Sequence, residues 1–208
     1  MIESKSKHIQ DDGVSIAIVR TPTNYTSKAI ISKIGKTNAD YSVANKRMIN
    51  CLLGSNLATG EIVTAGSESY LTVVSRKEMV QGQEISIIAH GLLCNATMTV
   101  TRSVDAYDEE GNPIGPTATT VINAMPCRAN QITARMRQED PGLLSTTVLK
   151  VYAQYNSAAR LLDKVSLGAY SVVMQPPSFV AYGEYRLDAI DRLEIPGCMV
   201  LQLSAWMG

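Results

Sequence analysis

The sequence predicts an all-β fold: a small β-barrel or sandwich with a long projecting β-hairpin, preceded by an N-terminal β-rich extension. A stretch of alternating side chains at 97–129 forms a two-stranded ribbon around an acidic Gly-Asn-Pro bend. Two further strand modules, each opening on glycine and carrying a tyrosine, occur at Gly66–Val74 and Gly183–Ile190. No long helical period appears in the chain, so strands account for most of it.

Length and composition bound the number of domains. A chain of 208 residues that is 45% hydrophobic suits one large or two small domains with a real core. The strand pattern divides it into an N-terminal β-rich extension or small domain (1–96) and a barrel (97–208) that carries the hairpin 97–126. The formal net charge is zero, so the chain lacks the positive field that binding to duplex DNA requires.

The cysteines and the apolar runs argue against metal sites and membrane spans. Cys51, Cys94, Cys127 and Cys198 are widely spaced and form no Cys-x-x-Cys pair. We therefore expect no zinc site, and buried, reduced thiols in a protein made in a cytoplasm. Residues 1–13 are polar and lack the apolar centre of a secretion signal, and no apolar run is long enough to cross a membrane. We expect no metal, no cofactor and no membrane partner.

The N-terminal part alternates between polar segments and short β-rich runs. We expect residues 1–13 to be mobile until bound, and Val14–Arg20 to form a strand that Pro22 ends. The lysine-rich segment 23–46 is interpreted as an exposed linker or arm, or alternatively as an arm lying on an acidic neighbour or on DNA. Three β-runs follow: 47–53, which equally fits a short helix, a hairpin at 60–74 with its turn at 65–69, and 84–90.

The ribbon has a two-residue period along its first strand. One face carries Met98, Val100, Val104 and Ala106, and the other carries Thr97, Thr99, Thr101, Ser103 and Asp105, with only Arg102 out of pattern. The bend lies at Asp108–Pro113, where glycine and asparagine tolerate a positive φ, and the return strand covers about 117–125. Because an isolated hairpin is only marginally stable in water, this half-apolar ribbon needs a partner surface.

The chain after the ribbon contains further strands. Arg128–Arg137 has three arginines and no acid, with helical spacing from Ala129 to Met136. Strands are expected at Val148–Tyr155, Asp163–Met174 and Tyr182–Ile190, the last paired with Gly197–Leu203. The C-terminal half then holds about six strands with short links, the number expected for a small barrel or sandwich.

Residues with catalytic chemistry are few and match no known type of site. His8 and His90 have no partner at triad or zinc spacing. The acidic bend lacks the ligand spacing of a calcium loop and is interpreted as a solvated hairpin tip. Asp188, near Asp191 and Glu194, is interpreted as part of a solvated face, and a hydrolase that uses these three acids is the alternative. We expect the protein not to be an enzyme.

Two features suggest contacts with other subunits. Arg128, Arg135 and Arg137 either lie on an exposed loop that pairs with Glu139 and Asp140, or provide inter-subunit salt bridges and a basic ring when the chain repeats around an axis. Trp206 is either an anchor into a neighbouring subunit or part of a frayed tail.

The order of motifs from the ribbon onward resembles a family of virion proteins. Thr-x-Thr-Val-Thr-Arg opens the ribbon at Thr97, Asp-Glu-Glu-Gly-Asn-Pro forms the bend, and the return strand ends in Pro-Cys-Arg. Val-x-Lys-Val-Tyr, Asp-Lys-Val, Gly-Glu-Tyr-Arg-Leu-Asp-Ala-Ile-Asp and Pro-Gly-x-x-Val-Leu-Gln-Leu follow in that order. Over about 97–203 the chain thus resembles the head-closure (stopper) proteins of tailed bacteriophages.

The resemblance implies a structural virion protein of the phage neck, without a cofactor, made in the host cytoplasm. Its subunits would form a homo-oligomeric ring of six or twelve copies that joins the portal or adaptor to the tail and helps to retain or pass genome DNA. The channel-gating tip is carried over onto Asp108, Glu109, Glu110, Gly111, Asn112 and Pro113. The longer N-terminal part leaves open another tail component, namely a tail terminator, tube or baseplate protein.

Overall fold

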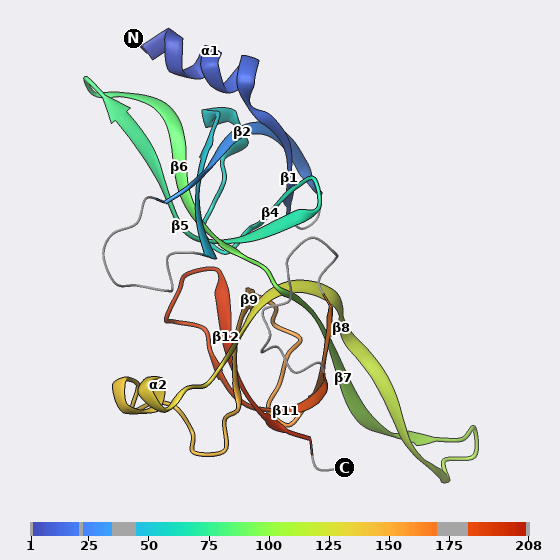
Figure 1. Cartoon of the computed structure of the whole chain (residues 1–208). Helices are drawn as coiled ribbons and strands as arrows, with labels where there is room; N and C mark the ends of the chain where they lie inside the picture. Colours follow the sequence, from blue (N-terminus) through green and yellow to red (C-terminus); the bar gives the residue numbers. More distant parts are fainter. Residues whose placement is uncertain (1, 21–22, 35–44, 170–182, 207–208) are drawn as a thin grey trace. The chain divides into compact units, whose positions relative to one another are not determined.

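The protein contains two closed, six-stranded antiparallel β-barrels, one in each half of the chain (Figure 1). The computed structural model describes residues 2–20, 23–34, 45–169 and 183–206. The predicted all-β fold with a barrel and a long hairpin is confirmed, and the N-terminal β-rich part is itself a barrel. The chain passes from the first unit to the second between Cys94 and Asn95, against a predicted boundary after residue 96.

The first barrel closes in the order β1-β2-β3-β6-β5-β4. Each neighbouring pair is antiparallel, and the predicted hairpin at 60–74 is the β4–β5 pair, which turns at Gly66. A short 3-10 turn, η2, spans Leu53–Ser55. The strands are β1 Val14–Val19, β2 Tyr25–Lys33, β3 Lys46–Cys51, β4 Ile62–Ala65, β5 Glu68–Val80 and β6 Gln83–Leu93.

Alternation of side chains produces the core of the first barrel. Along β6, Ile85, Ile87 and Ala89 point inward and are buried, which is the two-residue period of a strand with one covered face. Gly91 continues this row, and a Cβ added there would lie 2.9 Å from Cδ1 of Ile49 and from Cβ of Tyr70. The interior is therefore packed so closely at this point that only glycine fits without a shift of its neighbours.

The first residues form a helix, so the prediction that residues 1–13 are mobile until bound was wrong. Helix α1 spans Ile2–Asp12, and its Ile9 is completely buried. Lys5 on α1 pairs with Glu78 on β5, and the Gly13 N–H donates to the Ile9 carbonyl oxygen. The composition hid this helix because few of its described residues contact the barrel: Ile9 is buried, Lys5 pairs with Glu78, and the Gln10 carbonyl oxygen accepts a hydrogen bond from Nζ of Lys28.

The segment interpreted as a linker or arm contributes a barrel strand instead. Residues 25–33 form β2 between β1 and β3, where Ala29 is buried and Ile31 packs against the core. Residues 35–44 of that segment lie outside the described residues. The run at 47–53, which fitted a strand or a helix, lies mostly in strand β3. Lysine and serine on the outer face of β2 masked its inward-facing alternation.

The second barrel closes in the order β10-β11-β12-β9-β8-β7 and has the six strands that were predicted. Its core includes Met98, Val151, Leu187 and Leu201, all with no exposed surface. A short helix, α2 Ala134–Glu139, begins at the Thr133 cap, later than the helical spacing at 129–136 suggested, because β8 continues to Gln131. The strands are β7 Ala96–Tyr107, β8 Pro113–Gln131, β9 Leu149–Gln154, β10 Lys164–Ala169, β11 Gly183–Asp191 and β12 Cys198–Ala205.

The two barrels have the same strand connectivity. In each, the first three strands are neighbours in chain order, the third pairs with the sixth, and the first closes on the fourth. Strands β1–β6 therefore correspond in order to β7–β12. The barrels differ in which hairpin is long: it is β5–β6 in the first barrel and β7–β8 in the second.

Candidate assembly surface

The β7–β8 ribbon continues beyond its barrel as a hairpin (Figure 1). Among the described strands, β10 pairs with β7 only up to Thr101, and β9 pairs with β8 only from Cys127 onward. Two register shifts at the junction each place one extra residue on β8, and Ala124 there has a φ of 45°. Such bulges bend and twist a strand pair, so the ribbon changes direction where it leaves the barrel.

Arg102, the residue out of pattern in the sequence, fixes the base of the ribbon. Its Nε and Nη2 each donate to one carboxylate oxygen of Asp163 at 2.8 Å, and Nη2 also donates to the carbonyl oxygen of Ala158 at 2.7 Å. The Asp163 side chain is only 2% exposed. The hydrogen bond to Asp163 raises the pKa of the Arg102 guanidinium, as a charge-assisted hydrogen bond does.

Beyond Arg102 the apolar face of the ribbon has no cover within the described part of the chain. Met98 and Val100 are fully buried, whereas Val104 on the same face is 48% exposed. Tyr107, on the opposite face of β7, and Ile114, at the start of β8, are also uncovered, at 61% and 65% exposed. The predicted apolar face thus serves the barrel core in its first half only, and its distal half is the kind of exposed apolar surface that is typical of contact sites.

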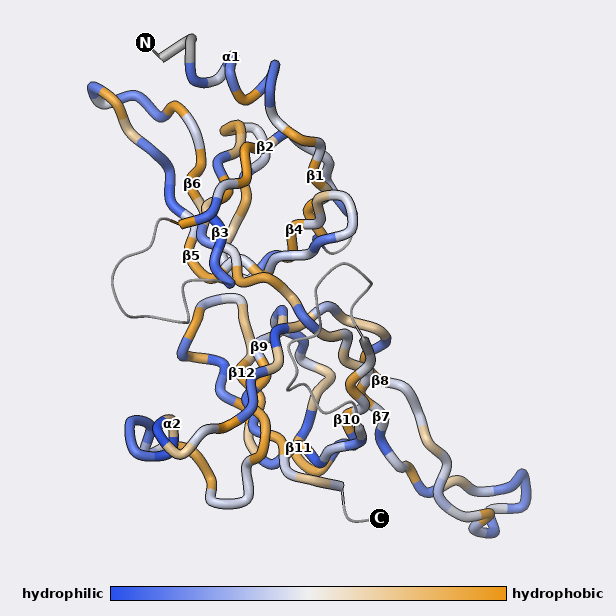
Figure 2. Tube along the Cα trace, in the orientation of Figure 1, coloured by the Kyte–Doolittle hydropathy of each residue, from blue (hydrophilic) through white to orange (hydrophobic). Residues whose placement is uncertain are grey.

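The tip is a compact acidic turn, coloured as hydrophilic in Figure 2. Oδ1 of Asp108 accepts hydrogen bonds from the backbone N–H of Glu110 and of Asn112, and Oδ2 accepts one from Nδ2 of Asn112. These bonds, with that from the Asn112 side chain the largest, lower the pKa of Asp108. Gly111 has a φ of 87°, which glycine adopts without strain. Asp108 therefore organises the turn, and Glu109 and Glu110 carry its exposed charge.

The three arginines do not form one cluster on a common element. Arg128 lies on β8 and donates to Asn130, whereas Arg135 and Arg137 lie on α2. Nε of Arg135 pairs with Glu139 at 2.6 Å, as one of the two predictions expected. Arg137 donates to the carbonyl oxygens of residues 144, 145 and 147 and so holds that loop against the helix. Their role in subunit contacts stays a prediction.

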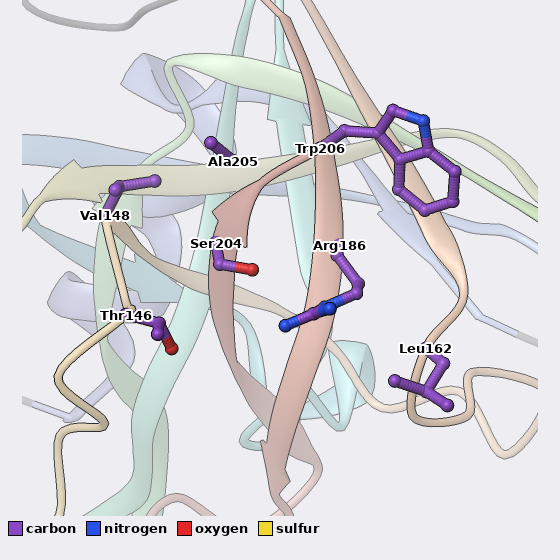
Figure 3. A pocket seen from close by; sticks show the side chains of 7 residues that line it. All are labelled: Thr146, Val148, Leu162, Arg186, Ser204, Ala205 and Trp206. Carbon is purple, nitrogen blue, oxygen red and sulfur yellow. The ribbon is translucent and has the colours of Figure 1, made fainter. Parts of the chain in front are cut away.

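Trp206 borders a cavity of about 490 Å³ at the end of β12 (Figure 3). Trp206 is 38% exposed, and the centre of its indole ring lies 5.6 Å from Nζ of Lys164. Its backbone N–H donates to the Glu184 carbonyl oxygen. Trp206 is thus held in place rather than part of a frayed tail. Figure 3 shows the Arg186 side chain lying across the strands at the centre of the cavity. The cavity is lined by Thr146, Val148, Leu162, Arg186, Ser204, Ala205 and Trp206.

Asp188 is not on a solvated face, contrary to the prediction. Its side chain is 7% exposed, and its carboxylate accepts hydrogen bonds from Nε of Arg186 at 2.7 Å and from Oγ1 of Thr146 at 3.2 Å. Burial alone would raise the pKa of Asp188, but the hydrogen bonds outweigh it and the pKa lies below its ordinary value. Asp191 and Glu194 are exposed, so the three acids of the hydrolase alternative do not share one environment. The sequence interpretation was wrong because Arg186, on the same side of the strand, was taken to mark a solvated face, whereas it is the hydrogen-bond partner of Asp188.

The other residues with possible chemistry lie apart from one another. All four cysteines are buried free thiols, as predicted, and burial raises the pKa of Cys198 to about 11. His8 pairs with Asp12 on α1, and His90 lies on β6. Within the described residues, no group of three or more histidine, cysteine or acidic side chains is arranged to hold a metal ion. No described helix has the length and apolar character needed to cross a bilayer.

Comparisons of the chain with protein-family models, with curated proteins and with solved structures gave no match. The assignment of function therefore depends on the ribbon and the cavity. Sequence reasoning located the ribbon and its tip, but it did not find the cavity. The residues around it come from four separate segments, 146–148, 162, 186 and 204–206, and no local pattern brings them together.

Proposed function

We propose that this chain is a structural protein of a phage neck, which forms a ring between the portal or adaptor and the tail and helps to retain or pass DNA. The ribbon is the observation that carries the proposal. Each barrel closes its own core, yet residues 103–120 stand outside with acidic and apolar side chains exposed. A long structured element that adds nothing to the core of its own barrel is suited to contact with other copies or other virion parts.

The charge of the ribbon supports a passage more than a DNA-binding role. Residues 103–120 contain Asp105, Asp108, Glu109 and Glu110 and no lysine or arginine. Repetition around an axis multiplies this charge by the number of subunits. Carboxylates that line a channel repel DNA phosphates rather than bind them, which favours release of the DNA over retention by adhesion.

A tail terminator, tube or baseplate protein is the second candidate. The shared connectivity of the two barrels favours it, because a chain with two equivalent barrels supplies two repeats of a tubular wall per copy. Both candidates are virion parts made of repeated subunits, and they differ in position along the particle.

Imaging of purified particles tests both candidates. We expect antibody labelling of this chain, or its density in a map of the particle, at the junction between head and tail. A position along the tail or at its far end supports the second candidate instead. Absence of the chain from purified particles contradicts both. A monomeric state in solution contradicts neither, because ring subunits can assemble only on the preceding ring.

A further inference from the structure

The cavity beside Trp206 and the distal part of the ribbon have complementary surfaces. We infer that the ribbon of one copy docks into this cavity on a second copy, with Tyr107 against the apolar wall and Asp105 on Arg186. The inference rests on the proposed function in one respect, since it needs neighbouring copies of the chain. It identifies the contact that holds them together.

The cavity offers an apolar wall with one cation at its centre. Val148, Leu162 and Trp206 are 37%, 69% and 38% exposed, although large apolar side chains are usually covered in a folded domain. Arginine has five N–H donors, and within the described residues the Arg186 guanidinium uses only Nε, in its bond to Asp188. Its side chain is 46% exposed, so the remaining donors are open to a second carboxylate.

The ribbon offers a matching pair of side chains. Because the side-chain period of a strand is two, Asp105 and Tyr107 project from the same face of β7, about 7 Å apart. Tyr107 is 61% exposed and Asp105 is also exposed. Neither side chain has a hydrogen-bond partner within the described residues. The exposed ring can pack on the apolar wall of the cavity, and the unpaired carboxylate beside it can pair with the arginine at the cavity centre.

The strand opposite them points to contact through side chains. Pro113 pairs with Tyr107 and Pro116 pairs with Asp105 on β8. Proline has no N–H to donate, so these two positions disfavour extension of β8 into a partner sheet. Docking of side chains into a cavity is therefore favoured over strand addition along β8.

Charge complementarity points to a second copy as the occupant. The distal ribbon, residues 103–120, carries four acids and no base. The rest of the described second unit, 95–102, 121–169, 183–191 and 199–206, carries eight lysines and arginines against six acids. Tyr107 and Trp206 are both exposed, so the ribbon does not occupy the cavity of its own chain. The tip carboxylates of Glu109 and Glu110 lie beyond the docked residues and remain free to line a passage.

Cross-linking between two cysteine variants of the full chain tests the docking. Ser103→Cys and Leu162→Cys place thiols on exposed positions of the ribbon and of the cavity, and Ser103 shares a face of β7 with Asp105 and Tyr107, which both stay in place. The native cysteines are all buried. The two variants are mixed at the highest soluble concentration and oxidised. We expect a disulfide-linked heterodimer on a non-reducing gel, with at least about fivefold more product than from random collision.

A matched control uses a thiol on another exposed surface. Leu193→Cys lies on the turn between β11 and β12, where residue 193 is 92% exposed. A mixture of Ser103→Cys with Leu193→Cys reports random collision alone. Equal yields from the two mixtures overturn the inference.

Charge variants give a second, independent readout. With the cysteine pair in place, Asp105→Lys should lower the cross-linking rate about three- to fivefold, and Arg186→Glu combined with Asp105→Lys should restore it. If Arg186→Glu lowers the melting temperature, the cross-linking rate of the cysteine pair with native Asp105 and Arg186 is measured at increasing salt concentration instead. A rate that does not fall with salt contradicts the role of the Asp105–Arg186 contact. If the chain cross-links but is absent from purified particles, the docking stands and the neck function is wrong. If the chain forms a neck ring but does not cross-link, the neck function stands and the docking is wrong.

Discussion

Charged side chains of the same type have different roles along the ribbon. Arg102 holds the base through a bidentate pair with a carboxylate that is 2% exposed, whereas Arg135 pairs with Glu139 on an open helix surface. Asp108 accepts hydrogen bonds from backbone N–H groups of the turn, whereas Asp105 has no partner within the described residues. Burial of the partner, rather than the presence of an ion pair, decides which of these charges stabilises the fold.

Arg102→Ala should destabilise the protein clearly more than Arg135→Ala. The first change leaves the buried Asp163 carboxylate without its cation and frees the ribbon base, whereas the second removes a pair whose side chains are 81% and 59% exposed. Urea denaturation followed by circular dichroism measures both. Equal midpoints for the two variants would show that Arg102 is not an anchor.

Single residues were predictable where burial followed from residue type. Four widely spaced cysteines in a polar-ended chain indicated buried thiols, and the structure has them. Asp188 was not predictable, because its partners Thr146 and Arg186 lie on a loop and on its own strand, and only the fold makes the carboxylate inaccessible. The cavity was missed for the same reason.

The turn at the ribbon tip is a separable part of the element. Replacing Asp108–Asn112 by Asn-Gly closes the hairpin with a two-residue turn and keeps Asp105, Tyr107 and Ile114. Because the proposed contact residues remain, we expect ring assembly to be unchanged while DNA retention in the particle is altered. Counts of filled and empty particles by electron microscopy measure this effect.

A charge-only variant is the control for the shortened turn. Glu109→Gln with Glu110→Gln keeps the length and removes the exposed charge. If charge is what matters, this variant changes DNA retention as the shortened turn does. A particle population that is unaltered by either variant argues against a gating role for the tip.

Attachment of helix α1 should depend on pH. Hydrogen bonds from Lys5 and from Ser86 lower the pKa of Glu78 below its ordinary 4.5. A lowered carboxyl pKa contributes stability that is complete above pH 4.5 and is lost as the pH falls through the lowered value. We expect α1 to become mobile as the pH falls below 4.5, measured by heteronuclear NOE values of its amides. Glu78→Gln should show that mobility already at pH 7, and Glu84→Gln, at an exposed pair with Lys77, should not.

At the level of elements, the sequence predicts amphipathic strands well, but it predicts poorly the elements with few buried residues and the bulges within strands. The alternation at 97–106 and at 148–155 found β7 and β9, because one face of each strand packs on a core. Helix α1 and strand β2 were missed, since their buried residues are few and lysines occupy the rest. The bulges at the ribbon base leave no sequence signal, because the residue that adopts a positive φ there is Ala124 rather than a glycine or an asparagine.

At the scale of the molecule, two barrels of one connectivity carry two separate cores. Among the residues that the structure describes, none belongs to both cores, and each barrel closes its own sheet edges by pairing its first strand with its fourth. Closure removes open edges from both barrels. The free hairpin β7–β8 is then an added feature of one barrel, since the corresponding pair in the other, β1–β2, is short.

Separate cores should give separable unfolding. Ile49 and Leu201 are both completely buried, one in each core. Ile49→Ala and Leu201→Ala should each cost about 2–5 kcal/mol in the barrel that contains them. We expect two transitions in scanning calorimetry, with Ile49→Ala lowering the temperature of one and Leu201→Ala that of the other. If each variant shifts the whole profile equally, the barrels unfold as one cooperative unit, and the ribbon-bearing barrel is not independently stable.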